Sequence, residues 1–195
     1  KNITLWGKPY IEDYIGEFNL RFLPIIFPGK SVQTEVLYSK ALEYENLKGS
    51  ENVFDAYCGA GTISLFLSKK AKKVTDIEIV EAAIKDAKAN AKANGINNAE
   101  FIVGEAEKVI LELIKMVIMQ TLLSSTLQEK AAAKAFNSIG MMKPARIVYV
   151  SCDPGTLARD IGILTEKGYK VEEIQPVHNV PGTAHVKCVV LITRK

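Results

Sequence analysis

Hydrophobic runs of strand length alternate with amphipathic segments of helical period from residue 52 to the end of the chain. The predicted strands are 52–57, 72–80, 99–104, 145–151, 169–177 and 185–193, with a weaker one at 115–119. The predicted helices are 59–70, 81–95, 129–140 and 156–167. Because buried strands that alternate with helices form parallel sheets, the pattern predicts a doubly wound α/β fold. The last two strands, joined by a short Pro/Gly loop, are expected to pair antiparallel at its edge.

The first thirty residues have a different pattern. Residues 3–27 are rich in strand formers and are broken by Gly7, Pro9 and Gly16, which is typical of short antiparallel strands. A helical period follows over 32–47. We therefore expect an N-terminal β-rich extension over residues 1–31, left from a preceding domain, and one main domain over 32–195. The start at Lys1 rather than Met also indicates a fragment of a longer protein.

Composition narrows the class of protein. The 195 residues are 48% hydrophobic with a formal charge of +3, which suits a globular domain and permits, without requiring, a nucleic-acid partner. Cys58, Cys152 and Cys188 form no C-x-x-C pair, so they predict neither a disulfide framework nor a zinc site. An odd cysteine count without a signal peptide favours the cytoplasm. No apolar run reaches the roughly 18 residues of a membrane span.

A glycine loop, "DAYCGAGT" at 55–62, follows the first strand of the α/β pattern. Gly59 and Gly61 permit a tight turn and the close approach of a ligand. Glu78, nineteen residues after Gly59, ends the next strand, where a carboxylate can accept both hydroxyls of an adenosine ribose. NAD would favour a third glycine where Ser64 stands. The pattern thus favours S-adenosylmethionine over a dinucleotide, and an NAD-dependent oxidoreductase stays a distant alternative.

A cysteine stands at the carboxyl end of the predicted strand 145–151, in "YVSCDPGTLARD". Ligands of α/β sheets bind at this edge. Pro154 and Gly155 end the strand, and the dipole of a helix beginning near Thr156 would bias the Cys152 thiol toward thiolate. Cys152 is therefore a candidate nucleophile, whereas Cys58 is expected to serve packing.

Three segments resemble the RNA (uracil-5-)-methyltransferases: "DAYCGAGTISLFL" at 55–67, the stretch 77–110 and "RIVYVSCDPGTLARD" at 146–160. "VQTEVLY" at 32–38 and "TAHVKCVVL" at 183–191 are similar to further family motifs. The resemblance implies a class I (Rossmann-like) S-adenosylmethionine-dependent methyltransferase fold, with 32–195 as the catalytic domain. Family members make 5-methyluridine in ribosomal and transfer RNA. Any iron–sulfur cluster would belong to a region N-terminal to this chain.

The resemblance also implies roles for single residues. Cys152 would be the nucleophile that adds to C6 of uracil and activates C5, and the target base would be flipped out of structured RNA. The implied cofactor-binding residues are Tyr57, Gly59, Gly61, Thr62 and Glu78, with Glu105 near the adenine. RNA is the implied partner, and no protein partner or membrane is implied.

Three family motifs are altered in this chain. Pro28 takes the place of a cofactor-contacting glutamine, and "MQTLLSS" at 119–125, including Gln120, takes the place of Asp-Pro-Pro-Arg. Lys187 stands where the family's His-x-Glu supplies the base, and we do not assign it that role. Two interpretations stay open: a module that binds S-adenosylmethionine or RNA without turnover, or an active enzyme that carries the family residues at these segments.

Overall fold

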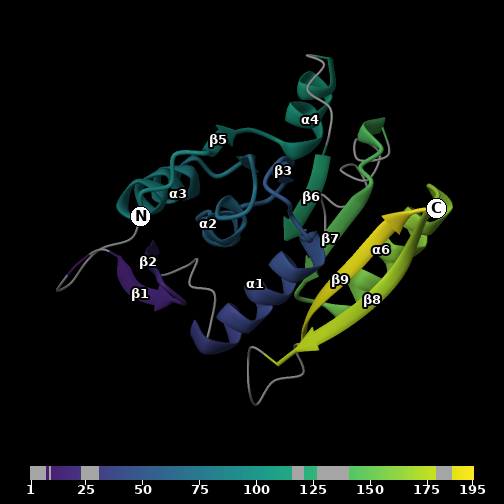
Figure 1. The fold of residues 1–195 in the computed structure, drawn as a ribbon, viewed down its shortest axis with the longest axis horizontal. Coiled ribbons are helices and arrows are strands. Elements are labelled where there is room, and N and C mark those ends of the chain that lie inside the picture. Colours follow the sequence, from purple (N-terminus) through teal and green to yellow (C-terminus); the bar gives the residue numbers. More distant parts are fainter. Residues whose placement is uncertain (1–7, 9, 23–30, 116–120, 127–140, 179–185) are drawn as a thin grey trace.

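The computed structural model describes residues 8, 10–22, 31–115, 121–126, 141–178 and 186–195, with two sheets (Figure 1). The small sheet is an antiparallel hairpin of β1 (Ile11–Ile15) and β2 (Phe18–Phe22). The large sheet has the order β5-β4-β3-β6-β7-β9-β8. Its strands are β3 (Asn52–Asp55), β4 (Lys73–Glu78), β5 (Ala99–Val103), β6 (Thr121–Thr126), β7 (Arg146–Ser151), β8 (Tyr169–Val177) and β9 (Lys187–Arg194).

Five described helices cover the two faces of the large sheet (Figure 1). They are α1 (Ser31–Glu45), α2 (Thr62–Ser68), α3 (Glu81–Ala93), α4 (Ala106–Lys115) and α6 (Pro154–Glu166). Helices α1, α2 and α3 share one hydrophobic cluster with the hairpin, and α4 and α6 share another on the opposite face. Among the described helices, none is long and apolar enough to cross a bilayer.

Strand side chains alternate between these two clusters. Val53 packs toward α1 and α2, whereas Phe54 packs toward α4 and α6. In β7, Val148 likewise belongs to the cluster with α1 and α2, and Tyr149 belongs to the cluster with α4 and α6. Because successive side chains of a strand point to opposite faces, a strand covered on both faces is apolar throughout, which is why the central strands are continuous hydrophobic runs.

The sheet confirms the predicted doubly wound α/β arrangement. Strands β5, β4, β3, β6 and β7 pair parallel. The last two strands form the expected antiparallel pair, in which β9 also pairs antiparallel with β7 and so lies between β7 and the edge strand β8. The hairpin confirms the short antiparallel strands expected near the N-terminus. The boundary at 31/32 stays a prediction.

Of the predicted strand at 115–119, only Lys115 lies among the described residues, and there the prediction is wrong because Lys115 ends helix α4. The sequence pattern did not predict α4, nor the strand β6 (Thr121–Thr126), which pairs with β3 and β7. The apolar residues of "AEKVILELIK" recur three and four residues apart, which is a helical period that gave a usable signal. The predicted helix 129–140 lies outside the described residues.

Side-chain amides attach the hairpin to helix α3. Asn90, itself buried, accepts from Arg21 N at 2.8 Å and donates to Arg21 O at 3.0 Å, as a neighbouring strand would. One turn later, Asn94 makes the same pair of bonds with Asn19. The same Asn90 amide also donates to Ala60 O at 3.3 Å, so β2, α3 and the glycine loop meet at one residue.

The hairpin's contribution to the core is testable at Leu20, which is fully buried. Leu20→Ala is expected to lower the free energy of unfolding by about 2–5 kcal/mol, because it removes methyl groups from a shared core. Urea denaturation measures this change. Ile11→Ala, at a 40%-exposed position of the same hairpin, should cost less than about 1 kcal/mol. Equal losses would show that the hairpin does not pack as described.

Candidate functional site

The site is built at the carboxyl ends of three parallel strands. β3 leads into the glycine loop, β4 ends at Glu78 and β7 leads into Cys152. Because parallel strands direct their carboxyl ends to one edge of the sheet, segments about 90 residues apart in sequence meet there. This edge is where α/β sheets bind ligands.

The two glycines of the loop have different local roles. Both have positive φ, 55° at Gly59 and 72° at Gly61, which other residues rarely adopt. A Cβ on Gly61 would lie 2.9 Å from Ala87 Cβ, so this glycine permits α2 to approach α3. A Cβ on Gly59 would have no atom within 4 Å. Gly59 therefore borders the open side of the loop, where a ligand can reach the backbone.

Glu78 connects the loop with the end of β4. Its Oε2 accepts from Gly59 N at 3.2 Å and its Oε1 accepts from Val80 N at 2.9 Å. A carboxylate offers about four acceptor positions, so each oxygen keeps capacity for one further donor, such as a ribose hydroxyl. The side chains of Ile79, Val80 and Val103 are about half exposed or more beside it, which sequence analysis had not singled out. They provide apolar surface next to the carboxylate.

Tyr57 and Glu105 lie at the margins of this arrangement. Tyr57 is half-buried, and burial followed by the charges of Glu107 and Glu78 raises the pKa of its hydroxyl. Glu105 is partly exposed and pairs with Lys108 at 2.8 Å. The predicted cofactor roles of both residues stay predictions.

A buried hydroxyl pair brings the cysteine segment and the glycine loop together. Tyr38 Oη in α1 lies 2.6 Å from Thr62 Oγ1 at the start of α2. Burial raises the pKa of Tyr38 to about 12, and its hydrogen bond with Thr62 offsets part of this shift. Tyr38 also shares a hydrophobic cluster with Val150 of β7, the strand that leads into Cys152. Tyr38 was not among the predicted site residues, although it lies in the "VQTEVLY" motif.

Cys152 is solvent-exposed, unlike Cys58 and Cys188, which are buried. It lies between the end of β7 and the first turn of α6, where Asp153 Oδ1 accepts from Thr156 N at 2.6 Å as the N-cap. The helix begins at Pro154 rather than near Thr156 as predicted, because proline suits the first helical turn. The cysteine is thus held between two regular elements.

Beneath the loop, two aspartates and a serine form a buried polar cluster. Asp55, Ser64 and Asp76 are each fully buried. Ser64 Oγ lies 2.7 Å from Asp76 Oδ1 and 3.3 Å from Asp55 Oδ2, while Asp55 Oδ1 accepts from Tyr57 N at 3.3 Å. In the sequence, Ser64 stands only where a dinucleotide fingerprint would have its third glycine. The fold instead places it against these two acids.

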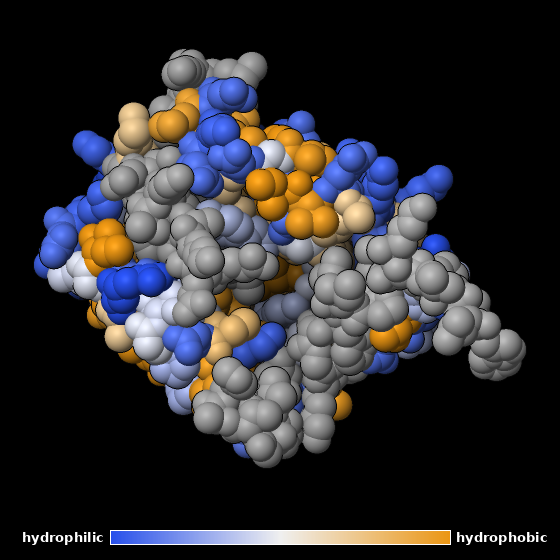
Figure 2. All heavy atoms as spheres, turned by 180° about the vertical axis from the view of Figure 1, so that it is seen from behind, coloured by the Kyte–Doolittle hydropathy of each residue, from blue (hydrophilic) through white to orange (hydrophobic). Residues whose placement is uncertain are grey.

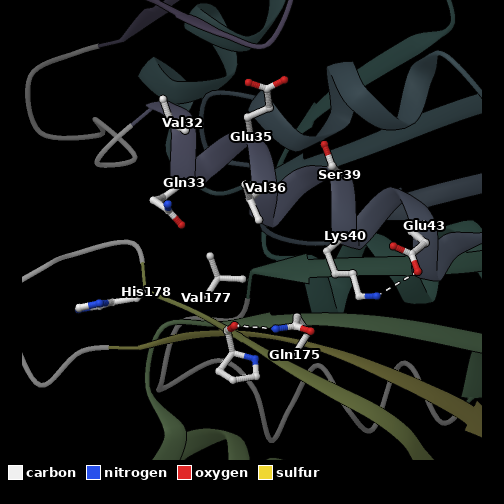
Figure 3. A pocket seen from close by; sticks show the side chains of 11 residues that line it. Val32, Gln33, Glu35, Val36, Ser39, Lys40, Glu43, Gln175, Val177 and His178 are labelled. Atoms are coloured by element: carbon white, nitrogen blue, oxygen red, sulfur yellow. Dashed lines mark hydrogen bonds and ion pairs between the residues drawn. The ribbon is translucent and has the colours of Figure 1, made fainter.

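A groove of about 670 Å³ lies at the same edge, between α1 and the end of β8 (Figure 3). Val36 and Lys40 line it from the helix, and Gln175, Val177 and His178 line it from the strand side. Glu35 and Glu43 offset the charge of Lys40, so the groove has no excess of positive charge for a polyanion. Elsewhere, hydrophobic groups are interspersed with hydrophilic ones, as Figure 2 shows for one face.

The altered motif positions are only partly described. Lys187 is half-buried at the start of β9, where its register partner on β8 is Val177. The next residue, Cys188, is the register partner of Ser151, which directly precedes Cys152. Position 187 therefore lies near Cys152 at the edge of the sheet. Pro28 and Gln120 lie outside the described residues. Among those described, no three His, Cys, Asp or Glu side chains are grouped as metal ligands.

Comparisons with known sequences agree with this arrangement. The model of a family described as tRNA (uracil-5-)-methyltransferase matches residues 25–195. The chain is 52% identical to an uncharacterized RNA methyltransferase of Clostridium tetani, over 99% of this chain and 42% of that protein. It is 50% identical to one of Bacillus cereus, over 100% and 43%. The chain therefore spans less than half the length of these relatives.

Solved structures confirm the predicted class I methyltransferase fold. Pyrococcus abyssi tRNA (uracil-54, C5)-methyltransferase, in complex with S-adenosyl-L-homocysteine, matches with a TM-score of 0.74 and 27% identity, over 96% of this chain and 45% of that one. The M. jannaschii tRNA m1G37 methyltransferase matches with a TM-score of 0.73 over 100% of this chain and 60% of that one. At 15% identity, the second likeness concerns the fold alone.

The different roles of the two glycines are testable by alanine substitution. Gly61→Ala is expected to lower the free energy of unfolding by about 3 kcal/mol, since it adds backbone strain to an overlap with Ala87. Gly59→Ala adds strain without an overlap and should cost about 1 kcal/mol. Urea denaturation of both variants measures the difference. A loss at Gly59 as large as that at Gly61 would contradict the described packing.

Proposed function

Because the chain belongs to the tRNA (uracil-5-)-methyltransferase family, we propose that it methylates C5 of uridine in transfer or ribosomal RNA with S-adenosylmethionine. The observation that carries the proposal is the position of Cys152. The exposed Cys152 follows β7 at the carboxyl edge of the sheet, the same edge at which the glycine loop leaves β3. A thiol in that place suits a reaction that needs a nucleophile beside the cofactor.

The loop fits the cofactor in three respects. Gly59 leaves its Cα side open, Glu78 keeps acceptor positions for the ribose hydroxyls, and Ile79 with Val103 offers apolar surface for a planar adenine. S-adenosylmethionine, when bound, supplies an electrophilic methyl group. The structure of the Pyrococcus abyssi relative contains S-adenosyl-L-homocysteine, which supports the same class of ligand here.

The chain's own part in the reaction is carried by Cys152. Its thiolate would add to C6 of uracil, forming the S–C6 bond and moving the C5–C6 π electrons into an enolate across C4 and C5. C5 then has the electron density that it lacks in free uracil, and covalent catalysis divides one difficult step into easier ones. C5 would take the methyl group as the S–CH3 bond of the sulfonium breaks, which leaves S-adenosylhomocysteine. A base then removes the C5 proton, the electrons of the C5–H bond form the C5=C6 double bond again, and the S–C6 electrons leave with the Cys152 thiolate.

Covalent trapping tests this role. With RNA that contains 5-fluorouridine, the C5 position carries fluorine in place of the proton, so the adduct is not resolved and should be seen as a cross-linked band or added mass. Cys152→Ala should abolish it, while Cys188→Ala removes a buried thiol and should retain it. Absence of an adduct with every tRNA and rRNA tested would count against the proposal.

The cofactor role of Glu78 is tested by calorimetry with S-adenosylhomocysteine. Glu78→Gln should raise its Kd about 10-fold or more, because a charge-assisted hydrogen bond is worth about 1.5–3 kcal/mol. Glu81→Gln is the matched control. Glu81 is exposed at the start of α3 and forms an ion pair with Lys85 of the same helix, so this variant should bind the ligand as the wild type does. If Glu78→Gln also bound with unchanged Kd, the ligand would lie elsewhere.

A second function is favoured by one residue. Lys187 stands at the cysteine edge where the family has a basic carboxylate, which favours a module that binds cofactor or RNA without completing turnover. Lys187→Glu distinguishes the two. Methyl transfer that appears only in this variant would indicate an impaired catalytic domain, whereas equal transfer by the wild type and Lys187→Glu would indicate that another group serves as the base.

A further inference from the structure

Asp55 and Asp76 are direct neighbours in the sheet. They are register partners on the parallel strands β3 and β4, and both side chains are fully buried on the face covered by α2. Ser64 in the first turns of α2 lies between them. Two ionised carboxylates side by side in a buried site disfavour each other strongly, as in other carboxyl pairs that share a proton.

The two contacts of Ser64 need two hydrogen atoms, and the Ser64 hydroxyl supplies only one of them. A serine hydroxyl carries one hydrogen and so can donate to one acceptor at a time. Ser64 Oγ lies within hydrogen-bond distance of both carboxyl groups. If both were ionised, one of these contacts would join two oxygens with no hydrogen between them. A protonated carboxyl that donates to Ser64, while Ser64 donates to the other, satisfies both contacts.

The surroundings place that proton on Asp76. Asp55 accepts the Tyr57 N–H as well as the Ser64 hydroxyl, which stabilises its ionised form. Asp76 Oδ2 is buried and has no hydrogen-bond partner among the described atoms, a state that suits a neutral carbonyl oxygen better than a charged one. The Asp76–Ser64 distance of 2.7 Å is the usual length of an O–H···O bond.

We propose that Asp76 is a positioning residue, held as a neutral carboxylic acid, which orients Ser64 and Asp55 and through them fixes the loop 55–62. Its hydroxyl donates to Ser64, Ser64 donates to Asp55, and Asp55 holds the Tyr57 amide. The effect on the cofactor rests on the proposed function. The neutral state and its effect on the loop do not.

The groups around the pair reinforce the neutral state. Burial raises the pKa of Asp55 to about 7 and that of Asp76 well above its ordinary value, where the charge of Asp55 adds to the shift. The other described groups that interact with the pair are Glu78 at the end of β4, Glu45 and Tyr38 on α1, and Cys58 in the loop. All of these are neutral or negative, so none supplies a compensating positive charge.

Infrared spectroscopy tests the neutral state directly. Glu45 is also buried with its pKa raised to about 8, so the comparison is made between Glu45→Gln and the double variant Glu45→Gln/Asp76→Asn. At pH 8.5, where Asp55 with its pKa of about 7 is ionised, the first should show the carbonyl band of a protonated carboxyl group, and the second should have lost it. An unchanged band in the double variant would overturn the proposal.

The pH dependence of unfolding gives a second test. An acid whose pKa is raised in the folded state binds more protons in the folded protein than in the unfolded chain. Its contribution to the free energy of unfolding is therefore fully present at low pH and is lost as the pH rises through the folded pKa. The wild-type folding constant should therefore fall by up to tenfold per pH unit for that proton between pH 4 and the pKa of Asp76. In Asp76→Asn, the plot of the logarithm of the folding constant against pH should have a slope that is shallower by the equivalent of one bound proton. An identical slope would show that Asp76 titrates normally.

Positioning is tested by amide hydrogen exchange at Tyr57 and by the Kd of S-adenosylhomocysteine. Asp76→Asn keeps a donor for Ser64 and should leave Tyr57 protected, with Kd within about threefold of the wild type. Asp76→Val removes the donor and should speed Tyr57 exchange and raise Kd about tenfold. Equal exchange in both variants would show that Asp76 does not act on the loop. If no variant bound the ligand, the proposed function would fail while the exchange result still stood.

Discussion

The register of β3 against β4 is the constraint on which the site depends. Because Asp55, the last residue of β3, pairs with Asp76, β4 continues two residues further and the glycine loop leaves the sheet beside Glu78. A shift by one residue would turn Val53 and Asp55 to the opposite face of the sheet. Asp55 would then lose its hydrogen bond with Ser64 of α2, and Gly59 would lose its hydrogen bond with Glu78. The same register that buries the core therefore assembles the ligand edge.

Polar groups hold this edge together from below. Tyr38 with Thr62, Ser64 with its two aspartates, and Asn90 with Ala60 each join the loop or α2 to a different neighbouring element. Buried polar groups are costly unless they are paired, so such a network specifies one arrangement more strictly than apolar packing alone. A site that must present a backbone to a ligand benefits from this restriction.

The cysteine edge and the loop edge are held by different means. Cys152 follows the apolar strand β7 and precedes the N-cap of α6, so its position is set by two regular elements. The hairpin reaches the loop through Asn90 and packs in the core that α1 and α2 share. Segments from both ends of the chain thus converge on one sheet edge, which couples the stability of the domain to the geometry of its site.

The sequence by itself determined the alternation of strands and helices, the glycine loop, Glu78 at the next strand end and Cys152 after an apolar strand, because these follow from local periodicity and turn residues. It left α4 and β6 unrecognised, since a short apolar run does not distinguish helix from strand. Only the tertiary structure decided that Tyr38 reaches Thr62 and that Ser64 lies between Asp55 and Asp76. Those contacts join residues 9 to 24 positions apart through sheet register and helix packing, which no local pattern in the chain encodes.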